Sequence, residues 1–206
     1  MDYNELLRGA PVGDYGASVA FLIEELPHGW LEDYRSMTPR ELAVDRIELN
    51  GFSYIFDSYS LRVAMGEAPP SPVEDRLVGA IGRSSCPDRK REVSRMQGWI
   101  GPTEQYFGKG RDKGHFIAHT IGGLVDGVEL NVFAQRRDLN RGWSDAGKRY
   151  RSMEQFSAAN PGTLCCSRPL YEDETCTPAA IEYGVLRPGP TWWIEVFDNR
   201  LARESE

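Results

Sequence analysis

The sequence predicts an α+β protein, with a central mixed or antiparallel sheet and helices packed around it. The class follows from two observations. Segments in which apolar and polar residues alternate, as they do in half-buried strands, occur in both halves of the chain. Helical patterns occupy the first 45 residues and one long stretch between the strand segments. A chain of 206 residues can also bury a core of ordinary size.

Residues 1–45 are predicted to form an acidic helical extension that precedes the main domain. An apolar run at 17–26 should be helical and should end at Pro27-His28-Gly29. Residues 38–41, Thr-Pro-Arg-Glu, form a capping box with proline at the first helical position, so a short helix is expected to begin there. His28 is interpreted as a loop histidine without a role in a site.

The main domain is predicted to span residues 46–199, and residues 200–206 are expected to be a frayed tail. Alternating apolar residues predict strands at 46–63, around a turn at Asp57-Ser58. Further strands are predicted at 76–81, 163–167, 180–186 and 192–197. One helix is expected between these strands, from the buried stripe Leu139, Trp143, Ala146, Tyr150, Met153 and Phe156. Trp143 and Tyr150 are therefore expected in the core.

Charge is distributed unevenly along the chain. The net charge is −7, which by itself argues against a nucleic-acid partner. Residues 1–82 carry −8 and residues 152–206 carry −5, whereas residues 83–151 carry +6. A polyanion would be attracted to the central segment alone, in a salt-sensitive way. A solvated charged face explains the same distribution equally well.

The four cysteines, Cys86, Cys165, Cys166 and Cys176, contain no Cys-x-x-Cys pair, which argues against a structural zinc knuckle. Cys165 and Cys166 are adjacent in a strand-like run and should point to opposite faces of a sheet. One of them could face Cys176 across a hairpin, but reduced and buried thiols are the favoured interpretation for a chain made in the cytosol.

Residues 111–141 combine groups suited to phosphodiester hydrolysis, which needs an activated water, a Lewis acid and cations that hold the substrate. His115 is the candidate base, because Gly114 allows close backbone approach and Asp112 can orient the local structure. Asn140 offers a hard oxygen ligand suited to Mg²⁺. The candidate phosphate contacts are Arg95, Arg111, Arg136, Arg137 and Arg141.

Three segments of this stretch, and a glutamate after it, resemble motifs of the DNA/RNA non-specific endonucleases of the ββα-metal class. The Asp-Arg-Gly-His motif of that family reads Asp-Lys-Gly-His at 112–115, and its Asn-x-x-Pro-Gln motif reads Asn-Val-Phe-Ala-Gln at 131–135. Leu-Asn-Arg stands at 139–141, and a glutamate follows at Glu154. The resemblance covers roughly residues 46–199, including a first strand similar to that of toxin-type members.

The resemblance implies a ββα-metal motif at the centre of the sheet and a nuclease that reads the backbone of DNA, RNA or both. His115 would deprotonate water, and Asn140 would be the sole direct protein ligand to Mg²⁺, with Mn²⁺ as an alternative metal. Glu154 would hold a metal-bound water. Lys113 and Asp112 complete the implied catalytic group.

The chain departs from the family pattern at three positions. Lys113 replaces an arginine and keeps the charge without the bidentate fork. Ala134 replaces a proline. Glu154 lies 14 residues beyond Asn140, and one unbroken helix would separate the two by about 21 Å. Glu154 can therefore reach the metal only if residues 142–147 form a loop.

Two other functions remain open at this point. His115 and His119, four residues apart, could begin a zinc site, but no glutamate stands between them and no third ligand is evident. The other alternative is a catalytically inactive nucleic-acid-binding or partner-docking module on a nuclease scaffold.

The location and partners are expectations of the same kind. No apolar run is long enough to span a membrane, and the acidic N-terminus does not resemble a secretory signal, so we expect cytosolic synthesis. A dedicated system could still export the protein as a toxin or effector. An immunity or inhibitor protein would then be its protein partner.

Overall fold

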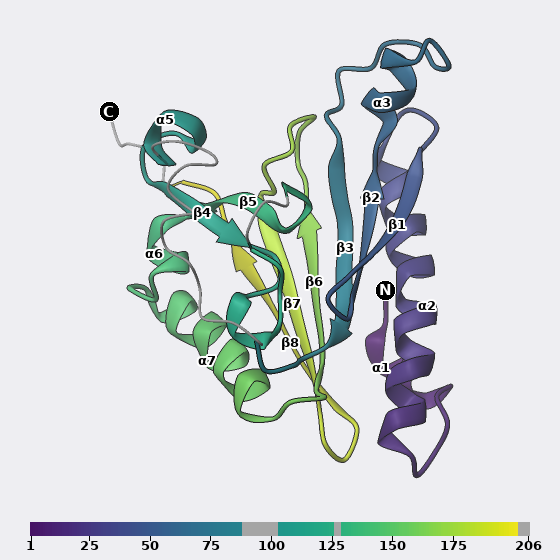
Figure 1. Cartoon of the computed structure of the whole chain (residues 1–206), viewed down its shortest axis with the longest axis vertical. Coiled ribbons are helices and arrows are strands. Elements are labelled where there is room, and N and C mark those ends of the chain that lie inside the picture. The colour runs from purple at the N-terminus through teal and green to yellow at the C-terminus, as the bar shows by residue number, and fades with distance from the viewer. Residues whose placement is uncertain (88–102, 126–128, 202–206) are drawn as a thin grey trace.

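Six antiparallel strands form the central sheet of the computed structural model, which describes residues 1–87, 103–125 and 129–201 (Figure 1). In spatial order the strands are β1 (Val44–Leu49), β2 (Phe52–Asp57), β3 (Arg76–Arg83), β6 (Leu164–Leu170), β7 (Ala180–Arg187) and β8 (Thr191–Asp198). A separate antiparallel pair consists of β4 (Arg111–His115) and β5 (Val132–Arg136). These strands and the helices around them confirm the predicted α+β class. The hairpin of the expected ββα-metal motif, however, forms its own sheet and does not lie at the centre of the six-stranded sheet.

The helices are short except for two. They are α1 (Tyr3–Arg8), α2 (Tyr15–Met37), α3 (Tyr59–Ala64), α5 (Thr103–Phe107), α6 (Arg137–Asn140) and α7 (Asp145–Ala159), with 3-10 turns η1 (His119–Ile121) and η2 (Glu129–Asn131). Within the described ranges, no helix combines the length and apolar character that a membrane span requires.

The two faces of the sheet are covered by different parts of the chain. Helices α1 and α2 pack on one face, where Val19, Leu22 and Trp30 are fully buried. The β4–β5 pair and helix α7 cover the other face, as Figure 1 shows. Cys165 belongs to this second core and Cys166 to the first, which confirms that they point to opposite faces. All four cysteines are free thiols.

The long connection between the adjacent strands β3 and β6 carries β4, β5, α6 and α7. Its two ends lie side by side. The Ser84 N–H donates to the Thr163 carbonyl at 2.8 Å, and the Gly162 N–H donates to the Ser84 carbonyl at 2.7 Å. All the described candidate catalytic residues therefore lie on one excursion from the sheet, which starts and returns at the same place.

Helix α2 is longer than the sequence predicts, because it continues through Pro27 to Met37. Leu26 and Trp30, on either side of the expected break, are both fully buried. Trp30 packs so closely on β3 that a Cβ added to Gly79 would lie 2.4 Å from its ring. Packing against the sheet therefore outweighs the cost of proline in a helix. His28 accordingly lies on an exposed part of this helix and not in a loop.

No helix begins at the predicted capping box; Thr38 instead caps the C-terminus of α2. Arg40, from the same tetrapeptide, forms an ion pair with the fully buried Asp57 at 3.0 Å. Asp57 also accepts hydrogen bonds from the Ala43 N–H and the Tyr34 hydroxyl. Residues 38–41 therefore join α2 to the sheet through a buried carboxylate.

The predicted strand at 46–63 is a hairpin followed by a helix. The turn lies at Asn50-Gly51, where φ is 52° and 83°, and not at Asp57-Ser58. Residues 59–64 form helix α3, which leaves Leu61 exposed. The predicted division at residue 45 stays a prediction, although α2 shares its core with the sheet.

Candidate active site

The hairpin of β4 and β5 positions the first two sequence motifs. Asp112 pairs with Gln135, and His115 pairs with Val132. Gly114 lies against the side chain of Gln135, and a Cβ there would come within 2.4 Å of Gln135 Cβ. The absence of a side chain at Gly114 therefore lets the Gln135 side chain pack directly over strand β4.

Asn131 fixes the chain immediately after His115. Its fully buried side chain accepts a hydrogen bond from the Ile117 N–H at 2.8 Å and donates to the Ile117 and Leu124 carbonyls at 2.9 and 2.8 Å. The Phe116 N–H donates to the Asn131 carbonyl. The asparagine of the second motif thus acts on the backbone that follows the candidate base.

Asp112 connects the hairpin to helix α6. Its carboxylate accepts from Arg141 Nε at 2.6 Å and Nη2 at 3.1 Å, and from Arg137 Nε at 3.0 Å. The side-chain amide of Asn140 lies 3.4 Å from the same carboxylate. One buried carboxylate therefore brings together the first motif and the Leu-Asn-Arg segment.

The protonation state of Asp112 follows from these contacts. Burial by itself would raise the pKa of the carboxyl group, but hydrogen bonds from Arg141, Arg137 and Asn140 outweigh burial and hold the pKa below its usual range. Asp112 is therefore an anion at neutral pH, which suits a residue that positions cationic and amide side chains.

His115 and Lys113 occupy the same face of β4, opposite the face of Asp112, because side chains alternate along a strand. Both are partly buried. His115 lies three residues from Asp112, about 10 Å along the strand. The structure thus joins Asp112 directly to Asn140, and it places His115 on the same short strand, at the end that leads into η1.

Helices α6 and α7 are separate, and residues 141–144 connect them. The connection is shorter than the loop at 142–147 that the family spacing suggested, because α7 already begins at Asp145 with Ser144 as its N-cap. Helix α7 folds back along the connection. Arg151 Nη2 donates to the Asn140 carbonyl at 3.2 Å, so the second turn of α7 contacts the candidate metal ligand.

Glu154 lies one turn beyond Arg151 on α7 and is half-buried. Burial raises its pKa to about 7, and the positive charge of Arg151 only partly opposes this effect. The carboxylate in turn helps to raise the pKa of Tyr150, Cys165 and Tyr183, after the larger effect of burial on each. Glu154 therefore faces the second core, and its role as a metal-water ligand stays a prediction.

The raised pKa of Glu154 predicts a pH-dependent stability. A group whose folded pKa exceeds its unfolded pKa stabilises the fold below the unfolded value, and this contribution is lost as pH rises towards the folded value. In the presence of chelator, Glu154→Gln should therefore exceed the wild type in stability at pH 8, by about 1–3 kcal/mol. The difference should shrink towards acid pH. Urea denaturation at several pH values measures it.

The exposed Glu67 provides the control, since Glu67→Gln should show little change at any pH. A Glu154→Gln effect of constant size across the pH range would contradict the assignment of a raised pKa.

The predicted phosphate contacts differ in how they are engaged. Arg95 lies outside the described residues. Arg111 donates to the Ala134 and Asn199 carbonyls at 3.0 and 3.3 Å, and burial lowers its pKa. Arg136 Nε donates to Asp138 at 2.6 Å. Both side chains are thus engaged in contacts within the protein.

Arg137 and Arg141 are held by Asp112, and Arg137 also contacts Glu104 at 2.7 Å. The Arg141 side chain is 46% exposed and the Arg137 side chain 27%. Of the four described arginines, Arg141 therefore offers the most surface to a ligand. Asp112 uses only two of the N–H groups of Arg141, so the others can donate to a phosphate.

The donor atoms of the site fit Mg²⁺ better than Zn²⁺. Among residues 1–87, 103–125 and 129–201, no three or more His, Cys, Asp or Glu side chains gather as a metal cluster. A zinc site that starts from His115 and His119 therefore gains no third ligand there. Asn140 turns its amide nitrogen towards Asp112, so its oxygen points away from that carboxylate. One hard oxygen with several waters suits Mg²⁺.

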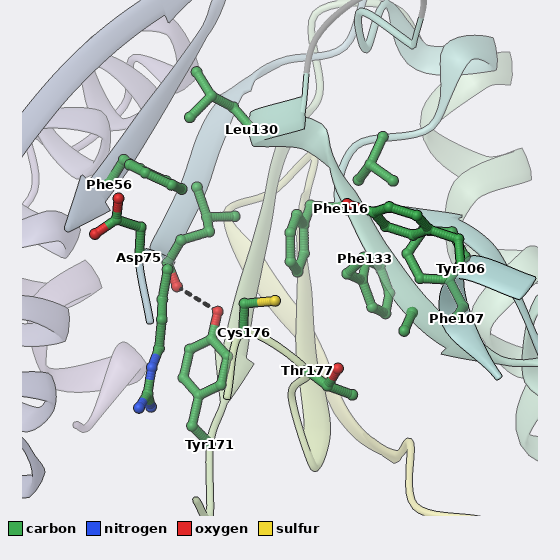
Figure 2. A pocket seen from close by; sticks show the side chains of 14 residues that line it. Phe56, Asp75, Tyr106, Phe107, Phe116, Leu130, Phe133, Tyr171, Cys176 and Thr177 are labelled. Atoms are coloured by element: carbon green, nitrogen blue, oxygen red, sulfur yellow. Dashed lines mark hydrogen bonds between the residues drawn. The ribbon is translucent and has the colours of Figure 1, made fainter. Parts of the chain in front are cut away.

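A cavity of about 540 Å³ lies beside the hairpin, between β5 and the start of β3 (Figure 2). Aromatic rings from several elements line it: Phe56, Tyr106, Phe107, Phe116, Phe133 and Tyr171. Arg76, which is 5% exposed, also lines it, and its guanidinium lies 4.7 Å from the centroid of Tyr171. Within the described residues, Arg76 Nε has no hydrogen-bond acceptor.

Sequence reasoning missed three contributors to this region. Glu104 contacts Arg137 and Arg151 contacts Asn140, but no local pattern marks Glu104 or Arg151. Trp143 was assigned to the core, yet it is 63% exposed, whereas Tyr150 is buried as predicted. The signal for Trp143 was present in the sequence. Ser144 is a good N-cap residue, so the helical stripe should begin after Trp143.

The comparisons with known proteins add little to this description. No protein-family model matches the sequence, and no curated protein matches it. Among solved structures, an extracellular endonuclease is similar with a TM-score of 0.37 and 14% identity, over 80% of this chain and 82% of that chain. We draw no functional conclusion from a likeness of this degree.

Proposed function

We propose that this chain is a Mg²⁺-dependent nuclease that hydrolyses phosphodiester bonds of DNA or RNA without sequence specificity. The observation that carries the proposal is the Asp112 carboxylate, which binds Arg137, Asn140 and Arg141. Residues 112–115 and 139–141 resemble nuclease motifs, lie far apart in the sequence and are joined through this one side chain.

His115 would act as the general base. It lies at the end of β4, and Asn131 holds the backbone that follows it. A neutral imidazole can accept the proton of an attacking water, and a positioned base of this kind accelerates hydrolysis by roughly 10²- to 10⁴-fold. Lys113, on the same face of β4, would place a positive charge near the phosphate.

Asn140 would hold the Mg²⁺ through its side-chain oxygen. When bound, the ion would supply Lewis-acid stabilisation of the negative charge on the phosphate and the leaving oxygen. Asp112 and Arg151 orient Asn140, through its side-chain nitrogen and its carbonyl respectively. Glu154 would accept hydrogen bonds from a water of the metal shell.

Cleavage assays with purified protein test the proposal directly. Plasmid DNA and RNA should be cut with Mg²⁺, and chelator should abolish the cutting. Asn140→Ala should reduce the activity to about the level seen with chelator, while Asn4→Ala, at an exposed and distant asparagine, should cut normally. Failure of the wild type to cut under any divalent metal would overturn the proposal.

We further propose that the protein acts as a toxin or effector and is restrained by an inhibitor protein. A nonspecific nuclease made in the cytosol endangers its own cell, so its activity needs a partner that blocks it. Export would then require a dedicated secretion system. Co-expression with a candidate inhibitor from the same genome should restore growth that the nuclease alone prevents.

The cavity beside the hairpin favours a second function, a catalytically inactive partner-docking module. Its aromatic walls and the buried Arg76 would accept an aromatic side chain next to a carboxylate on a partner protein. Absence of cleavage, together with partner binding that is lost in Arg76→Met, would favour this function over hydrolysis.

A further inference from the structure

Trp143 is an exposed tryptophan beside the candidate metal ligand. It lies in the α6–α7 connection, three residues after Asn140, and 63% of its surface is exposed. Exposure of so much apolar surface is unfavourable for a side chain without a ligand. Tryptophan combines a large flat surface with few rotatable bonds, which is why it is common in binding sites.

The backbone holds Trp143 in place. Gly142 has a φ of +68°, a left-handed conformation that turns the chain out of α6. The Trp143 N–H then donates to the Asp138 carbonyl at 2.9 Å, and Ser144 starts α7 by capping the Gly147 N–H. The indole is thus carried by a short connection that is anchored at both ends.

Arg141 holds the indole from one side. Its guanidinium lies 4.9 Å from the ring centroid, and Asp112 fixes that guanidinium through two hydrogen bonds. A cation over one face of the ring leaves the indole exposed elsewhere. Asp112 therefore aligns Asn140 and, through Arg141, Trp143 at the same time.

Cationic residues flank this tryptophan in the sequence, at Arg141 on one side and on helix α7 on the other. Arg151 contacts Gly142, where an added Cβ would lie 2.7 Å from its side chain. Lys148 and Arg149 lie on the first turns of α7 and are exposed, and each also pairs with a carboxylate, Asp145 and Glu195 respectively. An exposed aromatic ring among cations is the arrangement by which proteins bind single-stranded nucleic acids, with a base stacked on the ring.

We propose that Trp143 is a stacking platform for an unpaired base of the nucleic-acid substrate. The inference rests on the proposed nuclease function and adds a preference for single-stranded or locally unpaired substrates. In a duplex both faces of a base are covered by its neighbours, so stacking on Trp143 requires an unpaired base. Every base has a π-face, so the contact is compatible with cleavage that ignores sequence.

Oligonucleotide binding in chelator tests the platform without turnover. The probe is a short, fluorescently labelled single strand, and fluorescence anisotropy measures its affinity. Trp143→Ala should weaken binding by about tenfold. Trp143→Phe should lose less affinity than Trp143→Ala. Trp143→Leu should lose nearly as much affinity as the alanine variant, because leucine keeps apolar surface but not the aromatic ring. Leu61→Ala, at an exposed apolar residue on α3, should bind normally.

A strand of the same length with abasic sites provides the second arm. Wild type should bind the abasic strand about as weakly as Trp143→Ala binds the normal strand. Trp143→Ala should have little effect on the affinity for the abasic strand. Equal affinities of wild type and Trp143→Ala for the normal strand would overturn the inference. So would full retention in Trp143→Leu, which would indicate a simple apolar contact such as one with a partner protein.

The outcomes separate this inference from the proposed function. A protein that never cuts but binds single strands through Trp143 keeps the platform and loses the nuclease. A protein that cuts normally, with Trp143→Ala equal to wild type in KM on single strands, keeps the nuclease and loses the platform. Circular dichroism and thermal unfolding confirm that each variant folds.

Discussion

Replacement of His115 by alanine is expected to reduce phosphodiester cleavage by roughly 10²- to 10⁴-fold, because the water would lose its positioned base. Binding should change far less, since the loss concerns a proton transfer and not a phosphate contact. Cleavage rates of plasmid with Mg²⁺ and oligonucleotide affinities in chelator measure the two effects separately.

The matched control is His28→Ala, which removes an exposed histidine of α2 whose side-chain contact is with Glu25 at 3.6 Å. This variant should cut as the wild type does. The base assignment also predicts that added imidazole partly restores the activity of His115→Ala. Wild-type cleavage by His115→Ala would exclude the residue as the base, and equal losses of binding and cleavage would indicate a structural role.

Replacement of Asp112 by alanine is expected to lower both stability and activity. Two guanidinium groups and one amide would lose a shared carboxylate that is itself 7% exposed. Removal of one partner from a buried ion pair costs about 3–5 kcal/mol, and the partial exposure of both arginines reduces the expected loss to about 2–4 kcal/mol. Cleavage should fall because Asn140 and Trp143 are no longer held.

Urea denaturation at several pH values measures the stability effect. The lowered pKa of Asp112 means that its contribution is present above the unfolded value and is lost as pH falls through the lower folded value. The difference between wild type and Asp112→Ala should therefore shrink in acid. Glu67→Ala, at an exposed carboxylate, should cost little. A pH-independent loss would point to packing and not to charge.

The sheet was predictable because its strands carry a local signal. Short segments rich in apolar residues became β3, β6, β7 and β8, and the structure confirms all four predicted strands. The order of these strands was not predictable, because β3 pairs with β6 across about 80 residues, and no local pattern encodes that distance.

Several errors in local structure arise because contacts between distant residues override local preference. Pro27 should end a helix, but Leu26 and Trp30 are buried on either side of it. Leu61 and Val63 suggest a strand, yet they lie in helix α3. The predicted capping box at 38–41 starts no helix, because Arg40 within it forms an ion pair with Asp57.

The candidate site was likewise predictable where the signal is local and unpredictable where it depends on contacts between distant residues. Its motif residues, His115 and Asn140 among them, could be found from order and spacing. The contacts of Asp112 could not, because β4 meets α6 only in the folded chain. The exposure of Trp143 was predictable from the N-cap residue Ser144, but the helical spacing of apolar residues continues across the break between α6 and α7 and concealed it.

The segment between β3 and β6 leaves the sheet and returns to it at one place, where hydrogen bonds join Ser84 to Thr163 and to Gly162. Such a segment could be replaced without loss of the sheet if it made no contribution to the core. It also contributes Phe116, Ile121 and Tyr150 to the core over the sheet. Deletion would expose an apolar sheet face prone to aggregation. The proposed chemistry and the covering of this sheet face therefore depend on one segment.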